Sequence, residues 1–212
     1  MNIKRFALGP FMTNVYIVSD RHGAAVLIDP AGETSTIIGW LKSNNLDLKA
    51  ILLTHGHVDH VAGLEGNSLS DMANGEIYIN RRDSEMVLNP PIELGQELGF
   101  NFNGIPSFKN IEDEDELHFG DIRVKVTATK GHTPGSVCFM VAESDEQPVL
   151  FSGDTLFAGS VGRTDLPGGD FSALEESLVK LSLLPPELVV YPGHGPGTTI
   201  LNEMRKNPFW PR

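Results

Sequence analysis

A chain of 212 residues is long enough for one substantial hydrophobic core and short for two, so we expect a single domain over residues 1–212. With 28 acidic and 16 basic side chains, the formal net charge of −12 argues against a nucleic-acid-binding surface. The lone cysteine, Cys138, excludes an intramolecular disulfide, and no apolar run approaches the roughly 18 residues of a membrane span. Gly9-Pro10 interrupts the start where a signal peptide would need an apolar stretch, so we expect a cytoplasmic protein without membrane contact.

Short apolar and β-branched runs between turn signals predict strands in both halves of the chain. In chain order, these runs are residues 15–19, 25–28, 50–53, 76–79, 122–128, 136–142, 149–151 and 188–191. Apolar residues at helical spacing predict helices over residues 34–43, 61–72, 171–184 and 198–206. This alternation suits two packed sheets with helices outside them, although periodicity alone equally allows a doubly wound parallel sheet.

Residues 89–115 lack strong periodicity and are expected to form a long loop. The stretch contains Pro90-Pro91, three glycines and the aromatic residues Phe100, Phe102 and Phe108. Long loops in compact domains are often lids or binding elements, so these rings are candidates for an aromatic wall beside a substrate. The alternative is a surface excursion whose phenylalanines pack back into the core.

A cluster of histidines directly follows the predicted strand 50–53. Seven histidines spread over 212 residues would place far fewer than one in a typical six-residue window, whereas residues 55–60 hold three and an aspartate. These residues are His55, His57, Asp59 and His60. Neutral imidazole and carboxylate are ligands that suit zinc, iron and manganese, so the cluster predicts a metal site at the end of a buried strand.

Four ligands from one segment cannot complete two metal spheres, so a dinuclear site requires further histidine or aspartate side chains. Three candidates also follow predicted strands: His132 follows residues 122–128, Asp154 follows 149–151, and His194 follows 188–191. A glycine stands next to each of them, which fits a close approach of backbone to a crowded site. Any one alone would more often be a turn residue, but together they indicate ligands.

The motif series resembles that of the metallo-β-lactamase superfamily over nearly the whole chain. It comprises His-x-His-x-Asp-His at 55–60, Gly-His-Thr-Pro-Gly at 131–135, Ser-Gly-Asp-Thr at 152–155 and Pro-Gly-His-Gly at 192–195. The segments 52–57, Gly-Arg-Thr-Asp at 162–165 and Asn-Pro-Phe at 207–209 are similar to those of compact bacterial glyoxalase II-like hydrolases. The resemblance implies an α/β (α+β) fold, a four-layer αββα sandwich in which helices flank two mixed sheets.

The resemblance also implies how the seven candidate ligands divide between two divalent ions, zinc being expected and iron or manganese the alternatives. It places His55, His57 and His132 at the first ion and Asp59, His60 and His194 at the second. The carboxylate of Asp154 would bridge the two ions. Asp59, His55 and His57 are the foremost candidates for catalytic groups. Because coordination depresses the basicity of a carboxylate, Asp59 ranks first as a ligand and second as a proton carrier.

The predicted reaction is hydrolysis of a small-molecule acyl thioester, such as S-lactoylglutathione or a related compound. Two close divalent ions can hold a bridging hydroxide at neutral pH, which would attack the thioester carbonyl, so no protein nucleophile is needed. The expected protein is a monomer or a weak homo-oligomer. Two alternatives are a persulfide dioxygenase, which carries Gly-Arg-Thr-Asp but uses one iron, two histidines and one aspartate, and a metal-binding scaffold without turnover.

Arg163 is the candidate substrate-binding residue. In full-length glyoxalase II enzymes the similar loop places a lysine here to hold a carboxylate of glutathione, so the resemblance implies a cation facing the substrate. An arginine can grip a carboxylate through two hydrogen bonds. The alternative is that Arg163 pairs with Asp165 and rigidifies its own loop.

Overall fold

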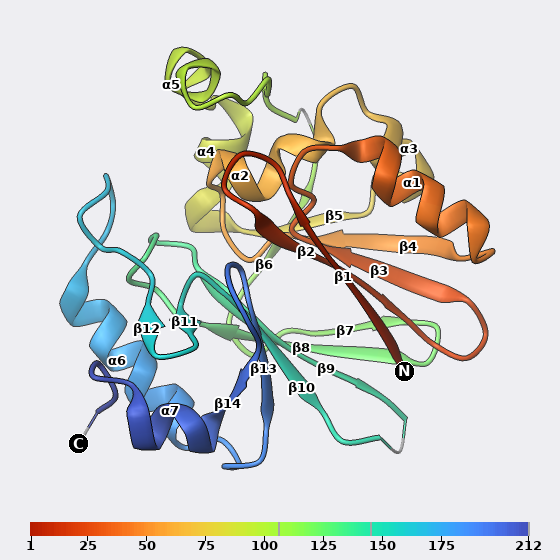
Figure 1. The fold of residues 1–212 in the computed structure, drawn as a ribbon. Helices are drawn as coiled ribbons and strands as arrows, with labels where there is room; N and C mark the ends of the chain where they lie inside the picture. Colours follow the sequence, from red (N-terminus) through yellow and green to blue (C-terminus); the bar gives the residue numbers. More distant parts are fainter. Residues whose placement is uncertain (106, 145, 212) are drawn as a thin grey trace.

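The computed structural model describes residues 1–105, 107–144 and 146–211, which form four layers with helices outside two stacked sheets (Figure 1). The first sheet joins six strands in chain order: β1 (Asn2–Leu8), β2 (Thr13–Ser19), β3 (Ala24–Ile28), β4 (Asp47–Leu52), β5 (Ile77–Asn80) and β6 (Lys109–Ile111). Strands β1 to β3 are antiparallel, whereas the pairs from β3 to β6 are parallel.

The second sheet is mostly antiparallel, with one parallel pair between β10 and β13. Its order is β14 (Thr198–Thr199), β13 (Val189–Pro192), β10 (Val149–Gly153), β9 (Val137–Glu143), β8 (Ile122–Ala128) and β7 (Glu116–Phe119). A separate small hairpin pairs β11 (Leu156–Phe157) with β12 (Ser160–Val161).

The helices divide between the two outer faces (Figure 1). On the side of the first sheet lie α1 (Thr34–Ser43), α2 (Val58–Val61), α3 (Ser68–Met72), α4 (Ser84–Leu88) and α5 (Ile92–Glu97), with 3-10 helices at Ala62–Leu64 and Arg81–Asp83. On the side of the second sheet lie α6 (Phe171–Ser182) and α7 (Ile200–Lys206).

The apolar core consists of three layers, and strand β3 shows why its sequence is continuously apolar. Successive side chains of a strand point to opposite faces, and both faces of this sheet are buried. Ala25 and Leu27 pack in the layer under α1, whereas Val26 and Ile28 pack between the two sheets. A third layer lies beneath α6 and α7. The αββα fold class expected from the sequence is therefore confirmed, and a single doubly wound sheet is excluded.

The predicted helix 34–43 and strand 122–128 match the structure, but the helix predicted over 61–72 is wrong. The chain there forms α2, the 3-10 helix Ala62–Leu64 and α3, separated by an irregular turn. Gly66 and Asn67 adopt left-handed φ angles of 76° and 63°, which no helix accommodates. A Cβ on Gly63 would lie 2.5 Å from the carbonyl oxygen of Pro30, so a close contact with the β3–α1 loop also shapes this segment.

Another predicted helix needs correction at its start, and several elements were missed. The helix predicted from residue 198 begins at Ile200, because Thr198–Thr199 pairs with β13 as an edge strand. Strands β1, β6, β7, β11 and β12 and helices α4 and α5 were not predicted. Most of these elements are short, and short elements have too few residues to show periodicity.

The stretch 89–115 is not a continuous loop, since it contains α5 and β6. Phe100 and Phe102 are 4% and 3% exposed and belong to the apolar layer of the first sheet, and Phe108 packs against the same layer. The alternative in which the phenylalanines return to the core is confirmed for these rings, and the aromatic substrate wall is wrong for them. Pro106, within this stretch, lies outside the described residues.

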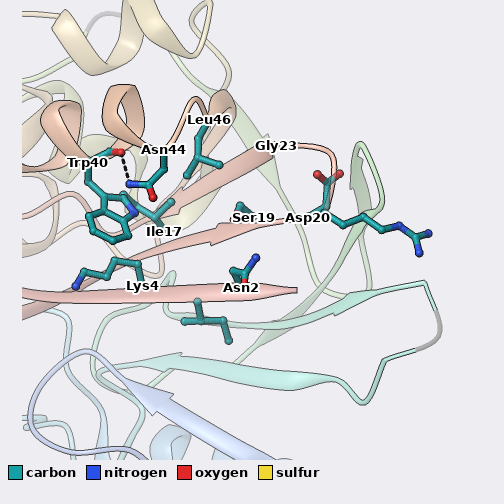
Figure 2. A pocket seen from close by; sticks show the side chains of 11 residues that line it. Asn2, Lys4, Ile17, Ser19, Asp20, Gly23, Trp40, Asn44 and Leu46 are labelled. Carbon is teal, nitrogen blue, oxygen red and sulfur yellow. Dashed lines mark hydrogen bonds between the residues drawn. The ribbon is translucent and has the colours of Figure 1, made fainter.

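A groove of about 540 Å³ lies between β1, β2 and α1 (Figure 2). Figure 2 shows Lys4 beside Trp40, and the Nζ atom of Lys4 lies 4.6 Å from the centroid of the indole ring. None of the candidate ligands lines this groove. The groove flanks the Asn2–Ser19 end of the β1–β2 hairpin, whereas Thr13, near the opposite end, contacts Asp59.

Among the described residues, no helix is both long and apolar enough to cross a bilayer.

Candidate metal centre

The candidate ligands converge because backbone hydrogen bonds join the strand ends that carry them. The amide of Val137, at the start of β9, donates to the carbonyl of Thr54 over 2.8 Å. Gly193 donates to the carbonyl of Gly153 over 2.8 Å and accepts from the amide of Asn14 over 2.7 Å. The segments that precede His55, Asp154 and His194 are thereby held at one edge of the two sheets.

The seven predicted ligands lie together in overlapping groups whose ligand atoms are within 4.8 Å of one another. These groups are His55, His57 and His132; His55, His60 and Asp154; and Asp59, His60 and His194. The carboxylate of Asp154 lies between the two sides, since its Oδ2 atom is 3.7 Å from His132 Nε2 and 3.5 Å from His194 Nε2. This placement suits a carboxylate shared by two cations.

The close approach of Asp154 to its neighbours requires glycine at position 193. A Cβ atom on Gly193 would lie 2.2 Å from Asp154 Oδ1 and 2.7 Å from a ring carbon of His60. Any other residue would displace one of these two side chains, because real contacts to a Cβ do not become that short. Gly193 therefore contributes to the site by having no side chain.

The candidate ligand atoms are arranged to bind cations rather than to satisfy one another through hydrogen bonds. The Nε2 atom of His55 and the Oδ1 atom of Asp154 are buried without a hydrogen-bond partner among the described residues. Buried polar atoms are nearly always paired, so such orphans need a partner. In addition, ring nitrogens face each other at 2.8 Å between His57 and His132 and at 3.3 Å between His60 and His194. Imidazole nitrogens and carboxylate oxygens in this arrangement form a ligand set suited to divalent metal ions.

The electrostatics of the site favour an ionised carboxylate at Asp154 and neutral imidazole, the form that binds metal, at His55 and His57. At His60 and His194 burial also favours the neutral ring, but Asp59 and Asp154 outweigh burial and raise the pKa of both histidines. Burial, together with the neighbouring imidazoles, holds the pKa of His55 well below its usual range and lowers that of His57 to about 4. Burial opposes ionisation of Asp154, but His60, His194 and His132 outweigh burial and lower the pKa of this carboxyl.

Hydrogen bonds to the second ring nitrogen orient several of the histidines. His132 Nδ1 lies 2.7 Å from the carbonyl oxygen of Arg163, and His194 Nδ1 lies 3.2 Å from that of Phe11. His60 Nδ1 lies 3.0 Å from Oδ2 of Asp29, which also accepts from the hydroxyl of Thr54 over 2.7 Å. Such contacts fix the tautomer and the direction of a metal-binding ring.

Sequence reasoning missed Asp29 and Asp83. Asp29 follows the predicted strand 25–28 directly, so the strand-end criterion that found Asp154 would have found it too. Asp83 follows no such pattern. Its Oδ1 atom accepts from the amide of Gly135 over 2.7 Å, and its Oδ2 atom accepts from the amide of Gly56 over 3.0 Å and the hydroxyl of Thr133 over 2.6 Å. This fully buried carboxylate joins the loop of His55 and His57 to the loop of His132, and burial raises its pKa.

The backbone of Arg163 lies beside the site, where its carbonyl contacts His132, whereas its side chain pairs with a residue of its own loop. Nε and Nη2 of Arg163 donate to the two carboxylate oxygens of Asp165, each over 2.8 Å. Both side chains are exposed, with 61% and 69% of their surface accessible. The pairing does not prevent the guanidinium from turning to a ligand, so substrate binding by Arg163 stays a prediction.

Comparison with known proteins identifies the family to which the chain is similar. The family model of the metallo-beta-lactamase superfamily matches residues 8–194, a range that includes all seven candidate ligands. A relative from Haemophilus influenzae, named hydroxyacylglutathione hydrolase GloC, is 34% identical over 99% of this chain and 98% of its own length.

Solved structures with the same fold carry several different descriptions. BLEG-1, described as a B3 metallo-beta-lactamase, superposes with a TM-score of 0.89 at 37% identity and covers 98% of this chain and 99% of its own. TTHA1623, solved in a di-iron-bound form, has a TM-score of 0.85 at 38% identity, with 97% and 99% covered. ETHE1 from Myxococcus xanthus has a TM-score of 0.78 at 27% identity, with 98% and 84% covered. With this fold, these motifs and these relatives, the chain belongs to the metallo-beta-lactamase superfamily.

Proposed function

We propose that this protein is a dinuclear metal-dependent hydrolase that cleaves a small acyl thioester, such as S-lactoylglutathione or a related compound. The observation that carries the proposal is the position of Asp154 between two groups of histidine and aspartate ligands. The similarity to a relative named hydroxyacylglutathione hydrolase supports the choice of a thioester. A small diffusible substrate, a cytoplasmic location and a monomer or weak homo-oligomer belong to the same proposal.

His55, His57 and His132 would hold one ion, Asp59, His60 and His194 the other, and Asp154 would bridge them. A bound pair of divalent ions would supply a hydroxide nucleophile at neutral pH and stabilise the oxyanion that forms on the carbonyl. Zinc is the metal we propose, with iron or manganese as alternatives.

Among the residues that the structure describes, we find no competing nucleophile at this site. The hydroxyl of Thr54 donates to Asp29, and that of Thr133 donates to Asp83, so both are engaged in holding loops. Cys138 is fully buried, and burial raises the pKa of its thiol to about 11, so it is not a thiolate at neutral pH. Asp59 accepts a hydrogen bond from Thr13 over 3.2 Å and lies 3.2 Å from His194, which orients it as a ligand.

A mononuclear persulfide dioxygenase is the less favoured alternative, because it would leave a second group of ligands unused. A scaffold without turnover is disfavoured by the same complete set of ligand side chains.

The proposal is tested by supplying purified protein with four substrates in parallel. These are S-lactoylglutathione, a short acyl thioester without glutathione, a chromogenic β-lactam, and glutathione persulfide in an oxygen electrode. We expect thiol release from at least one thioester and no oxygen uptake. Oxygen consumption with persulfide, without thioester cleavage, would replace the hydrolase by the dioxygenase, and turnover of the β-lactam alone would change the substrate class.

Arg163→Ala tests whether the guanidinium binds substrate. If it holds a carboxylate of the substrate, the variant should raise KM about tenfold for carboxylate-bearing thioesters and leave neutral thioesters nearly unchanged. Melting temperature and metal content should stay at wild-type values, because the pair with Asp165 is exposed. An equal loss of activity on both substrate types, accompanied by a lower melting temperature, would assign Arg163 to the structure of its loop instead.

A further inference from the structure

Helix α7 contains a buried carboxylate that has no contact with the candidate ligands. Glu203 is 2% exposed, and its oxygens accept from the hydroxyl of Thr198 over 2.5 Å, the amide of Gly159 over 2.8 Å and the side-chain amide of Asn207 over 2.8 Å. Among the residues that the structure describes, these donors are all neutral. Burying a carboxylate costs free energy that an apolar side chain would avoid, so the stability of α7 alone does not account for Glu203.

Asn207 also donates a hydrogen bond to the turn of the β11–β12 hairpin, next to the residue that Glu203 contacts. Its Nδ2 atom also donates to the carbonyl oxygen of Ser160 over 2.9 Å, and its Oδ1 atom accepts from the amide of Phe209 over 3.0 Å. Glu203 and Asn207 thus hold the backbone of Gly159 and Ser160 through one hydrogen bond each. The segment Asn207-Pro208-Phe209 is therefore tied to the turn of the β11–β12 hairpin.

The hairpin depends on outside contacts for its position. Each strand is two residues long, with Leu156 opposite Val161 and Phe157 opposite Ser160, and a pair this short is not stable by itself. Figure 1 shows β11 and β12 on the same side of the molecule as α6 and α7. Hydrogen bonds from α7 to the turn are thus in a position to fix where the returning strand runs.

Strand β12, the second strand of the hairpin, leads directly to the metal centre. A Cβ atom on Gly162 would lie 1.8 Å from the carbonyl oxygen of Asp154, so the backbone here packs against the proposed bridging residue. The next carbonyl, that of Arg163, lies 2.7 Å from His132 Nδ1. On the outgoing strand, the ring of Phe157 lies edge-on to that of His194 with 6.1 Å between the centroids. A displaced hairpin would disturb the surroundings of three candidate ligands.

We propose that Glu203 and Asn207 are positioning residues of the metal centre. They hold the β11–β12 turn, and the turn in turn places the Arg163 carbonyl that orients His132. This inference rests on the metal centre of the proposed function and is independent of the substrate.

The test is the zinc affinity of metal-stripped protein, measured by competition with a chromophoric chelator. Glu203→Ala and Asn207→Ala should each weaken zinc binding about tenfold, the lower end of the range for residues that orient a ligand. Glu203→Gln should stay within about twofold of wild type, because its amide oxygen can still accept from Gly159 and Asn207 while its NH₂ group donates to Thr198. This conservative variant separates hydrogen-bond geometry from charge.

Thr199→Ala is the matched control. The hydroxyl of Thr199 caps α7 by accepting from the amide of Asn202 over 3.2 Å, and it does not contact the hairpin. This variant should lower the melting temperature and leave zinc affinity unchanged. Unchanged affinity in Asn207→Ala, an equal loss in Glu203→Gln and Glu203→Ala, or an equal loss in Thr199→Ala would each overturn the inference. If Glu203→Ala does not fold, Asn207→Ala decides. The zinc-affinity measurement uses no substrate, so its result stands even if the protein does not hydrolyse thioesters.

Discussion

Asp154→Ala is expected to abolish nearly all hydrolysis and to weaken binding of both metal ions. The carboxylate lies 3.7 Å from His132 and 3.5 Å from His194, one from each proposed coordination sphere, so its loss removes a ligand from both. A metal centre supplies several kcal/mol of transition-state stabilisation, so we expect a loss of about a thousandfold in kcat/KM. Steady-state kinetics and elemental analysis of the purified variant measure both effects.

Asp165→Ala provides the control for this substitution. Asp165 is an exposed aspartate whose side chain pairs with Arg163, and it lies outside every group of candidate ligands. Its loss should leave metal content near wild type, because exposed ion pairs contribute little to stability. Two bound metals and normal turnover in Asp154→Ala would show that the bridging assignment is wrong.

Asp83→Ala is expected to cause the largest loss of stability among single substitutions at the site. Three buried donors, the amides of Gly56 and Gly135 and the hydroxyl of Thr133, would lose their acceptor together. Each unsatisfied buried group costs about 1–3 kcal/mol, so the free energy of unfolding should fall by roughly 3–5 kcal/mol. Denaturant titration of the metal-stripped protein measures this change without a contribution from bound metal.

The same substitution should also weaken metal binding, because Asp83 joins the loop of His55 and His57 to that of His132. Asp83→Asn is the graded control, since its amide keeps one acceptor oxygen and should give an intermediate loss of stability and affinity. A fall of less than about 1 kcal/mol in Asp83→Ala, with unchanged metal affinity, would show that the two loops are held by other contacts.

The candidate ligands could be found from sequence because each follows a strand that is itself recognisable. Buried strands such as β4 and β10 read as continuous apolar runs, and the polar residue after such a run stands at the edge of a sheet. Local pattern was sufficient for His55 and Asp154, and the structure brings all seven predicted ligands together.

What the sequence could not predict depends on contacts between distant segments. Asp83 is recognisable only once Gly56 and Gly135 are known to lie against it, 27 and 52 residues away in the chain. The interruption of the predicted helix 61–72 follows from the packing of Gly63 against Pro30 and from left-handed backbone at Gly66 and Asn67. Apolar spacing continues through that segment, so periodicity alone indicates one helix.

Metal content combined with turnover tests the dinuclear hydrolase most directly. Protein purified without added metal would be stripped, titrated with zinc or iron, and assayed at each step for thiol release from a thioester and for oxygen uptake with a persulfide. A dinuclear hydrolase should show hydrolysis that rises until two metal ions are bound per chain, and it should consume no oxygen. Saturation at one iron per chain, with oxygen consumed from the persulfide and no thioester cleaved, would contradict it.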